Sequence, residues 1–400
     1  MVIKSQHTGT SRGVILMVDD NPKNLQVLGT ILNNAGYNIE FALNGHSALD
    51  LVRKKKFDLI LLDVMMPDMD GFEVCRILKS DNEYKDIPVI FLSAQAEINF
   101  TLRGFEAGAA DYIYKPFNKL ELLSRVSSHL ELKKSRQLIE QYAKNLEIKN
   151  KLVTQSLRYA KQIQKAVLIS GYKPLKELRE HFLLFEPKDI ISGDFLWSHK
   201  IDDSIIIALI DCTGHGVPGA LISMLGVTFL NEIVVSERKT NTRKILTRMS
   251  HKIVHALSQK GMMEEVHDGM DASIISLNLK QMTLQYSGAF SSLYLIRDNV
   301  LTKLKGDRRP VGYIEFKSDF SSHKISLVRD DNLYIFSDGF PDQFGGKSGS
   351  KLKSRSFLNL LLEIHKKPLV EQKNILDNMF ECWKGDLDQV DDVTVFGLKI

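Results

Sequence analysis

The stretch Leu61-Leu62-Asp63-Val64-Met65-Met66-Pro67-Asp68-Met69-Asp70-Gly71 decides how the first part of the chain folds. Its opening residues end an apolar run over positions 58–62, and Asp63 follows the run directly. A continuous apolar run of this length is typical of a strand that is buried on both faces. Similar runs occupy positions 14–18, 87–92 and 109–114, and helical spacing separates them. The pattern predicts a doubly wound α/β fold with a parallel sheet.

Polar and charged residues follow these predicted strands at the point where each strand ends. They are Asp19 and Asp20, Asp63, Ser93 and Lys115. The carboxyl ends of parallel strands meet at one edge of the sheet, where ligands bind. Clustered carboxylates repel one another unless a cation neutralises them, and oxygen ligands suit Mg²⁺. A nearby lysine can pair with a phosphoryl group, although any one such aspartate alone would more often cap a helix.

This segment resembles the response-regulator receiver family over essentially its whole length. The resemblance rests on Asp19-Asp20, the stretch around Asp63, Ser93-Ala94 and Lys115-Pro116-Phe117. It implies a five-stranded receiver sheet and phosphorylation of Asp63, as a covalent nucleophile, by a partner histidine kinase. It also implies Mg²⁺ bound by Asp19 or Asp20, Asp63 and the backbone carbonyl of Met65. Ser93 and Lys115 would contact the phosphoryl group, and Tyr112 would be the switch aromatic residue.

A long helix is predicted to follow, because no Gly or Pro occurs between Pro116 and Gly171. One apolar column recurs every seven residues, which is typical of a coiled coil: Leu132, Ile139, Leu146, Val153, Ala160 and Val167. The companion column is more polar. We therefore expect a receiver domain at 1–130, a helical or coiled-coil linker at 131–170, a third region at 171–400, and a homodimer formed through the linker.

The third region reads as strand-rich with two central helices, at 217–235 and 242–259. Aspartates lie at the ends of its predicted strands, next to small residues: Asp194, Asp211, Asp271, Asp338, Asp391 and Asp392. Oxygen ligands that converge in this way predict hard cations. Two bridged metals could lower the pKa of a shared water and orient it toward a phosphate ester. A single Asp-Gly pair would instead mark a turn.

From about residue 158 to 400 the chain resembles the metal-dependent serine/threonine phosphatases of the PPM superfamily, in the SpoIIE/RsbU branch. The most specific stretch runs from Asp211 to Gly226, and Gln162–Leu168 resembles the regulatory entry helix of that branch. The resemblance implies an α-β-β-α sandwich with two Mn²⁺ or Mg²⁺ ions. Asp211 would bridge both ions. The other ligands would be the backbone carbonyl of Cys212, Asp338, Asp391 and Asp194, with Asp271 and Asp392 as weaker candidates.

Three departures from the family pattern affect this interpretation. Trp197 stands where many members have a second acidic residue, so Asp194 is alone. His215 lies four residues past Asp211, so it is either a general acid or a structural residue at a helix start. No arginine matches a phosphate-binding position, and Arg308-Arg309 is a speculative substitute that would more readily form a solvated turn.

Composition narrows the class of protein. The 400 residues are 44% hydrophobic and 26% charged, with a formal net charge of +4, which gives no indication of nucleic-acid binding. No apolar run approaches the length of a membrane span, and the N-terminal residues have no secretory pattern. Three widely spaced cysteines form neither a disulfide framework nor a zinc motif, so we expect a cytoplasmic protein that binds neither DNA nor membranes.

These observations predict a response regulator in which phosphorylation of Asp63 controls a protein serine/threonine phosphatase. The resemblance implies that the substrate is an anti-sigma-factor antagonist with a STAS-type fold, in a partner-switching pathway. The alternative is a scaffold whose phosphatase-like domain has little activity and binds its partner stoichiometrically under receiver control. The loss of an acid at Trp197 favours the scaffold, whereas the retained aspartates favour the enzyme.

Overall fold

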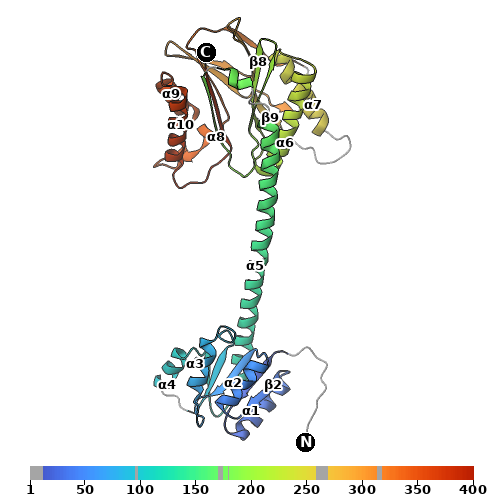
Figure 1. The fold of residues 1–400 in the computed structure, drawn as a ribbon. Helices are drawn as coiled ribbons and strands as arrows, with labels where there is room; N and C mark the ends of the chain where they lie inside the picture. The colour runs from blue at the N-terminus through green and yellow to red at the C-terminus, as the bar shows by residue number, and fades with distance from the viewer. Residues whose placement is uncertain (1–11, 95–97, 170–173, 179, 258–268, 313–317) are drawn as a thin grey trace. The chain divides into compact units, whose positions relative to one another are not determined.

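The computed structural model describes residues 12–94, 98–169, 174–178, 180–257, 269–312 and 318–400 (Figure 1). The chain divides into two compact units, Met1–Asn150 and Lys151–Ile400. A single helix, α5 (Lys119–Ile169), begins in the first unit and ends in the second. The domain boundary expected at residues 170 and 171 lies outside the described residues, and the three-part division stays a prediction.

The first unit alternates strands and helices, as the sequence predicts. Its parallel sheet has the strand order β2-β1-β3-β4-β5. The elements are β1 (Val14–Val18), α1 (Pro22–Asn34), β2 (Asn38–Ala42), α2 (Gly45–Lys54), β3 (Leu59–Asp63), α3 (Gly71–Ser80), β4 (Val89–Ser93), α4 (Ile98–Glu106), β5 (Asp111–Tyr114) and the start of α5. Strand β2 escapes the apolar-run criterion because it is an edge strand and only its last residue is buried.

Both faces of this sheet are covered, which explains the continuous apolar strands. Within β3, Ile60 and Leu62 pack into one core cluster, and Leu59 and Leu61 pack into the other. The second cluster includes three residues of α5, spaced four apart and fully or almost fully buried: Leu122, Val126 and Leu130. The first turns of α5 are therefore the last helix of the first unit.

The second unit is built mainly from antiparallel strands. Its elements are the end of α5, η2 (Pro174–Glu177), β6 (Glu180–Glu186), β7 (Phe195–Ile201), β8 (Ser204–Cys212), α6 (Gly216–Leu230), the π-helical turn η3 (Asn231–Ser236), α7 (Thr242–Leu257), β9 (Gly269–Asn278), β10 (Thr283–Ala289), β11 (Ser292–Arg297), β12 (Val300–Lys305), β13 (Val311–Gly312), β14 (His323–Ser326), β15 (Asn332–Phe336), α8 (Gly339–Asp342), β16 (Phe344–Gly345), β17 (Ser350–Lys351), α9 (Ser354–Ile364), α10 (Leu369–Lys384) and β18 (Val393–Lys399).

Two sheets pack face to face and are covered by helices on their outer sides. One sheet has the order β14-β10-β9-β8-β7, with β13 added to β9, and the other has the order β12-β11-β15-β18-β6. Ile205, Ile207 and Leu209 of β8 point into the core between the sheets, which also contains Ile335 of β15. Ile206 packs on the opposite face with residues of α6 and α7. The fold is the predicted α-β-β-α sandwich.

Helices α9 and α10 cover the outer face of the second sheet, and the sequence analysis did not predict them. Their apolar residues have helical spacing, which was the available signal: Phe357, Leu361 and Ile364 in α9, and Leu369, Leu376 and Phe380 in α10. The expected helix at 242–259 is α7, and its last expected residues lie outside the described part of the chain.

One described helical segment, Gly216–Ser236, is long and apolar enough to cross a membrane by length and composition alone. Half of it is buried within the second unit. Ile222, Val227 and Leu230 belong to the core cluster that α6 shares with β8. A helix in the core of a folded domain satisfies the same length and composition test.

Candidate phosphoacceptor and active sites

The first candidate site lies at the carboxyl edge of the parallel sheet. Strands β1 and β3 are neighbours, with Val18 opposite Leu62, so that Asp19 and Asp63 follow paired residues. Carboxylate oxygens of Asp19, Asp20 and Asp63 all lie within 4.8 Å of one another. Asp19 and Asp63 are buried and Asp20 is exposed. The fold thus brings together the three carboxylates that the sequence analysis grouped.

Lys115 connects the two buried carboxylates. Its Nζ lies 2.8 Å from Oδ2 of Asp19 and 2.8 Å from Oδ2 of Asp63. The side-chain amide of Asn24 also donates to both oxygens of Asp19, at 2.9 and 3.0 Å. Burial raises the pKa of Asp63, and the hydrogen bond and charge of Lys115 offset only part of this effect. Three carboxylates with one lysine leave excess negative charge, which fits a divalent cation such as Mg²⁺.

The side chain of Ser93 is buried at the end of β4, and that of Tyr112 is buried within β5. The Tyr112 ring packs against Phe91, with ring centroids 5.4 Å apart. Its hydroxyl fills space that Gly104 leaves open, since a Cβ added at Gly104 would lie 1.2 Å from that oxygen. Burial raises the pKa of Tyr112 to about 12. The inward position of the predicted switch residue therefore requires glycine at position 104.

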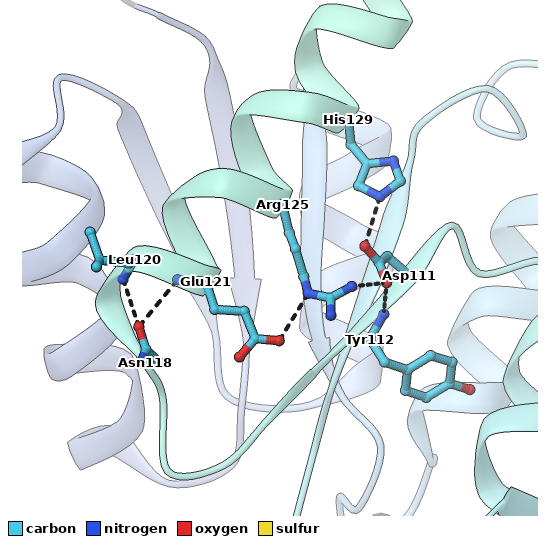
Figure 2. A network of polar contacts seen from close by, with 7 residues as sticks. All are labelled: Asp111, Tyr112, Asn118, Leu120, Glu121, Arg125 and His129. Carbon is cyan, nitrogen blue, oxygen red and sulfur yellow. Dashed lines mark hydrogen bonds and ion pairs between the residues drawn. The ribbon is translucent and has the colours of Figure 1, made fainter.

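A polar network that the sequence analysis missed joins β5 to α5 (Figure 2). Asp111 accepts a hydrogen bond from Nη1 of Arg125 at 2.6 Å and lies 3.1 Å from Nε2 of His129. Burial alone would raise the pKa of Asp111, but these partners and the Tyr112 N–H lower it. Asn118 caps α5 by accepting from the N–H groups of its first turn. The strand that carries Tyr112 is thus tied directly to the long helix.

The second candidate site lies at one edge of the sandwich, where strands from both sheets end. Asp211 in β8 pairs across the strands with Asp271 in β9. Asp338 follows β15 and Asp391 precedes β18. Asp211, Asp271 and Asp338 line one cleft of about 180 Å³. The structure therefore gathers carboxylates from positions more than a hundred residues apart.

Electrostatic interactions connect these carboxylates. Burial raises the pKa of Asp211 well above its ordinary value, and the charges of four other aspartates raise it further: Asp194, Asp338, Asp391 and Asp271. Burial, and then the charge of Asp338, raise the pKa of Asp271 to about 6. Such mutual repulsion is relieved by bound cations, and the all-oxygen donor set fits Mg²⁺ or Mn²⁺. The carboxylates are more widely spaced than in the first site: across the described ranges, the trio of Asp19, Asp20 and Asp63 is the one set of three within 4.8 Å.

Asp194 and Asp392 are both buried, and they differ in their partners. Asp194 accepts a hydrogen bond from the hydroxyl of Thr394 at 2.6 Å, and burial raises its pKa to about 7. Asp392 accepts from the hydroxyl of Ser192 at 2.9 Å and from the N–H of Gly193 at 2.7 Å. Asp392 thus fastens the loop that carries Asp194, which gives this residue a positioning role in the fold.

Gly193 and the segment after Asp211 approach each other closely. A Cβ at Gly193 would lie 2.9 Å from the carbonyl oxygen of Gly214 and 3.2 Å from that of Cys212. The thiol of Cys212 is buried, and burial raises its pKa, so this side chain is held as the neutral thiol. The glycine thereby brings the loop of Asp194 next to the backbone of Cys212.

Two of the three sequence departures acquire a physical explanation. Trp197 is buried in the core cluster of α6 and α7, and its indole N–H donates to the side chain of Asn231 at 3.1 Å. This position therefore faces away from the cleft. Arg309 is buried, with its guanidinium 4.0 Å from the ring centroid of Phe320, so the expectation of a solvated turn is wrong for this residue, while Arg308 is exposed.

His215 precedes the first turn of α6 and is half exposed. Its Nδ1 lies 2.7 Å from Oδ2 of Asp189, an interaction that orients the imidazole ring. His215 is not among the residues that line the described cleft. The geometry therefore supports a place at the start of the helix, and the general-acid role stays a prediction.

We expect cations to stabilise the second unit more as the pH rises. Asp194 and Asp271 have folded pKa values of about 7 and about 6, above the unfolded value of about 3.9. From about pH 4 to pH 7 the metal-free folded domain therefore binds more protons than the unfolded chain. Its free energy of unfolding falls as the pH rises through this range. Melting curves from pH 5 to 8, with Mn²⁺ or with a chelator, should show a gap in Tm that widens with pH. A gap of constant size would contradict this reading of the carboxylates.

The two sites and folds define the class of protein. A parallel sheet with the Asp19, Asp63 and Lys115 site is a receiver domain, and a sandwich with an acidic cleft is a PP2C-like domain. The protein is a response regulator that carries a PPM-type phosphatase domain.

Comparisons with known proteins give the family. Residues 201–400, half of the chain, match the family described as stage II sporulation protein E (SpoIIE), and residues 15–127 match the response regulator receiver domain. The chain belongs to the SpoIIE family. These matches confirm the predicted family and fold class.

Known proteins are similar to this chain over part of its length. The SiaA-PP2C domain of Pseudomonas aeruginosa is 30% identical, with a TM-score of 0.56, over 63% of this chain and 98% of that domain. The DNA-binding dual master transcriptional regulator RpaA of a Synechocystis strain is 35% identical over 48% of this chain and 80% of RpaA. The transcriptional regulatory protein YvrH of Bacillus subtilis is 44% identical over 29% of this chain, and the match spans about half of YvrH.

Proposed function

We propose that phosphorylation of Asp63 controls a metal-dependent phosphatase that removes phosphate from a phosphoserine or phosphothreonine protein. The substrate that we propose is an anti-sigma-factor antagonist with a STAS-type fold. The observation that carries this proposal is the convergence of Asp211, Asp271 and Asp338 on one cleft, in a chain that also contains the buried site of Asp63 and Lys115.

At the receiver site, an oxygen of Asp63 attacks the phosphorus of a phosphohistidine on the kinase. The O–P bond forms, the N–P bond breaks, and the histidine leaves with a proton from solvent. Lys115, already 2.8 Å from Asp63, pairs with the incoming phosphoryl oxygens. Asp19, Asp20, Asp63 and the carbonyl of Met65 would hold Mg²⁺, which offsets charge on the phosphoryl group. Ser93 and Tyr112 would then respond to the new group.

At the phosphatase site, Asp211 would be shared by two Mn²⁺ or Mg²⁺ ions. The remaining ligands would be the carbonyl of Cys212, Asp338, Asp391 and Asp194, with Asp271 at the side of the cleft. When bound, such a pair supplies a water of lowered pKa and holds the phosphate oxygens. Hydrolysis would add one water to the substrate phosphorus, break the bond to the serine or threonine oxygen, and release inorganic phosphate and the side-chain hydroxyl. Thr394 and Asp392 keep Asp194 and its loop in place for this reaction.

The proposed route of control is α5. Its C-terminal turns belong to the phosphatase fold, where Leu168 joins the core cluster. Gln164 is buried and donates through Nε2 to the carbonyl of Ser192, at 2.7 Å, and to the hydroxyl of Ser223, at 3.1 Å. Ser192 also binds Asp392, beside Asp194. A rotation or shift of α5 would therefore act directly on the loop of Asp194.

We also propose that the protein is a homodimer through α5. The exposed fractions of Leu132, Ile139, Leu146 and Val153 are 66%, 67%, 59% and 58%, so the first four residues of the apolar column are uncovered in a single chain. A second copy of the helix would cover them in a coiled coil. A monomeric mass in solution, with Asp63 phosphorylated and unphosphorylated, would argue against this arrangement.

The experiment that tests the function is hydrolysis of a small phosphate ester and of a phosphoserine protein in the presence of Mn²⁺ or a chelator. We expect turnover of both substrates that depends on the metal. Stoichiometric binding of the phosphoprotein without turnover of either substrate would favour the scaffold instead. The cytoplasmic location, and the absence of DNA and membrane binding, stay predictions.

A further inference from the structure

Two chemically different kinds of side chain line the cleft of the phosphatase site. Asp211, Asp271 and Asp338 are acidic, whereas Lys303 is basic and lines the cleft together with aromatic residues. Lys303 is the one cationic side chain among the residues that line the cleft in the described part of the chain. A cation at this place is unexpected from the sequence, because Lys303 lies in no motif and next to no aspartate.

Lys303 is exposed, and its strand pairing fixes where it points. It lies in β12 directly opposite Tyr294 of β11, and residues that face each other across two strands share one face of the sheet. Its Nζ lies 5.3 Å from the centroid of the Tyr294 ring, which attracts a cation. Throughout the described ranges, no carboxylate is paired with Lys303 in a salt bridge, so its charge is available to a binding partner.

The tyrosine that supports Lys303 is itself held by a stack of aromatic rings. Tyr294 stacks on Phe336 with centroids 5.0 Å apart and ring planes 11° apart. Phe336 in turn meets Phe357 of α9 edge-on, at 4.7 Å. Phe336 lies two residues before Asp338. The same stack of rings therefore positions Tyr294, which supports Lys303, and Asp338, a proposed metal ligand. Phe290, with 54% of its surface exposed, adds an apolar rim to the same cleft.

The position of Lys303 suits a part of the substrate other than the phosphate. Leu301, two residues earlier and thus on the same face of β12, packs against the cluster that contains Phe357 and helix α9. Lys303 therefore stands on the outer face of its own sheet, whereas Asp211 and Asp271 are carried by strands of the other sheet. A peptide chain entering the cleft would pass this lysine beside its phosphorylated residue.

We propose that Lys303 is a specificity-determining residue that pairs with an aspartate or glutamate side chain flanking the phosphorylated residue of the protein substrate. This pairing would give the proposed phosphatase a preference for substrates with acidic flanking residues, and it rests on that proposed function. An exposed ion pair of this kind strengthens binding modestly and weakens as salt screens it. Its main effect is therefore on KM for acidic phosphopeptides.

The test uses the full chain with Mn²⁺ and two phosphoserine peptides that differ only in flanking Glu or Gln residues. For the wild type, kcat/KM should be roughly three- to five-fold higher for the Glu peptide, as expected of one exposed ion pair. The difference should lie in KM and diminish in high salt. Lys303→Glu should reverse the preference. Lys324→Glu, an exposed lysine on β14 at the far edge of the other sheet, should retain it.

The ratio between the two peptides is measured within each variant, so a general loss of activity does not affect it. The proposal is overturned if the wild type does not distinguish the peptides, or if Lys303→Glu still prefers the Glu peptide. Turnover of a small phosphate ester by the wild type is measured alongside. Absence of that turnover would contradict the phosphatase function itself, which separates the two failures.

Discussion

Replacing Asp211 with Asn should lower kcat/KM for a phosphoserine protein by on the order of 10³-fold, equivalent to ~4 kcal/mol of transition-state stabilisation. Asp211 is a half-buried carboxylate whose ionisation is disfavoured by the charges of four other aspartates, and we place it between the two cations. Asn keeps the shape of the side chain and removes its charge. The site then loses the one group that both cations would share.

Loss of folding would not explain this result. The charges of Asp194, Asp338, Asp391 and Asp271 all disfavour ionised Asp211, so a neutral side chain relieves repulsion in the metal-free fold. We therefore expect Asp211→Asn to melt, in the presence of a chelator, no lower than the wild type. The matched control is Asp203→Asn, in the turn before β8, where a half-exposed carboxylate pairs with Lys280. Activity of Asp211→Asn at the level of this control would rule out the proposed site.

The sequence predicted those parts of both sites that depend on where a strand ends. Asp19, Asp63 and Lys115 follow strands of one parallel sheet, and such strands must bring their carboxyl ends to a common edge. The same reasoning located Asp211 and Asp338 in the sandwich. These positions follow because apolar runs mark buried strands, and the residue after such a run lies where the strand ends. The roles of these residues in metal binding and catalysis stay a prediction.

The remaining features depend on side-chain direction and tertiary contact, which spacing does not encode. Asp391 and Asp392 are adjacent in sequence, yet only the structure shows that Asp392 binds the loop of Asp194. Trp197 could be recognised as a missing acid, but its position in the helix-side core appears only in the fold. Lys303 reaches the cleft because β12 pairs with β11 in one register. Gly104 lies against the Tyr112 hydroxyl because any larger side chain would clash with it, and no sequence motif predicts this contact.

Replacing Asp63 with Asn should abolish all effects of phosphodonors on the phosphatase. An amide lacks the nucleophilic oxygen that forms the acyl phosphate, so neither a kinase nor a small acyl-phosphate donor can modify the site. The matched control is Asp68→Asn, an exposed residue five positions later whose positive φ of 69° asparagine also tolerates. Phosphate incorporation, measured by mass, should be complete in the control and absent in Asp63→Asn.

The same samples then test whether the receiver and the phosphatase communicate. Phosphorylation would exchange the ion pair between Lys115 and the Asp63 carboxylate for one between Lys115 and the phosphoryl group, and the strand that precedes Lys115 is tied through Asp111 to Arg125 and His129 of α5. At its other end α5 holds the loop of Asp194 through Gln164. Donor treatment should therefore change the phosphatase rate of the wild type and of Asp68→Asn, and leave Asp63→Asn unchanged. Equal rates for phosphorylated and unphosphorylated wild type would show that α5 joins the two domains without carrying a signal between them.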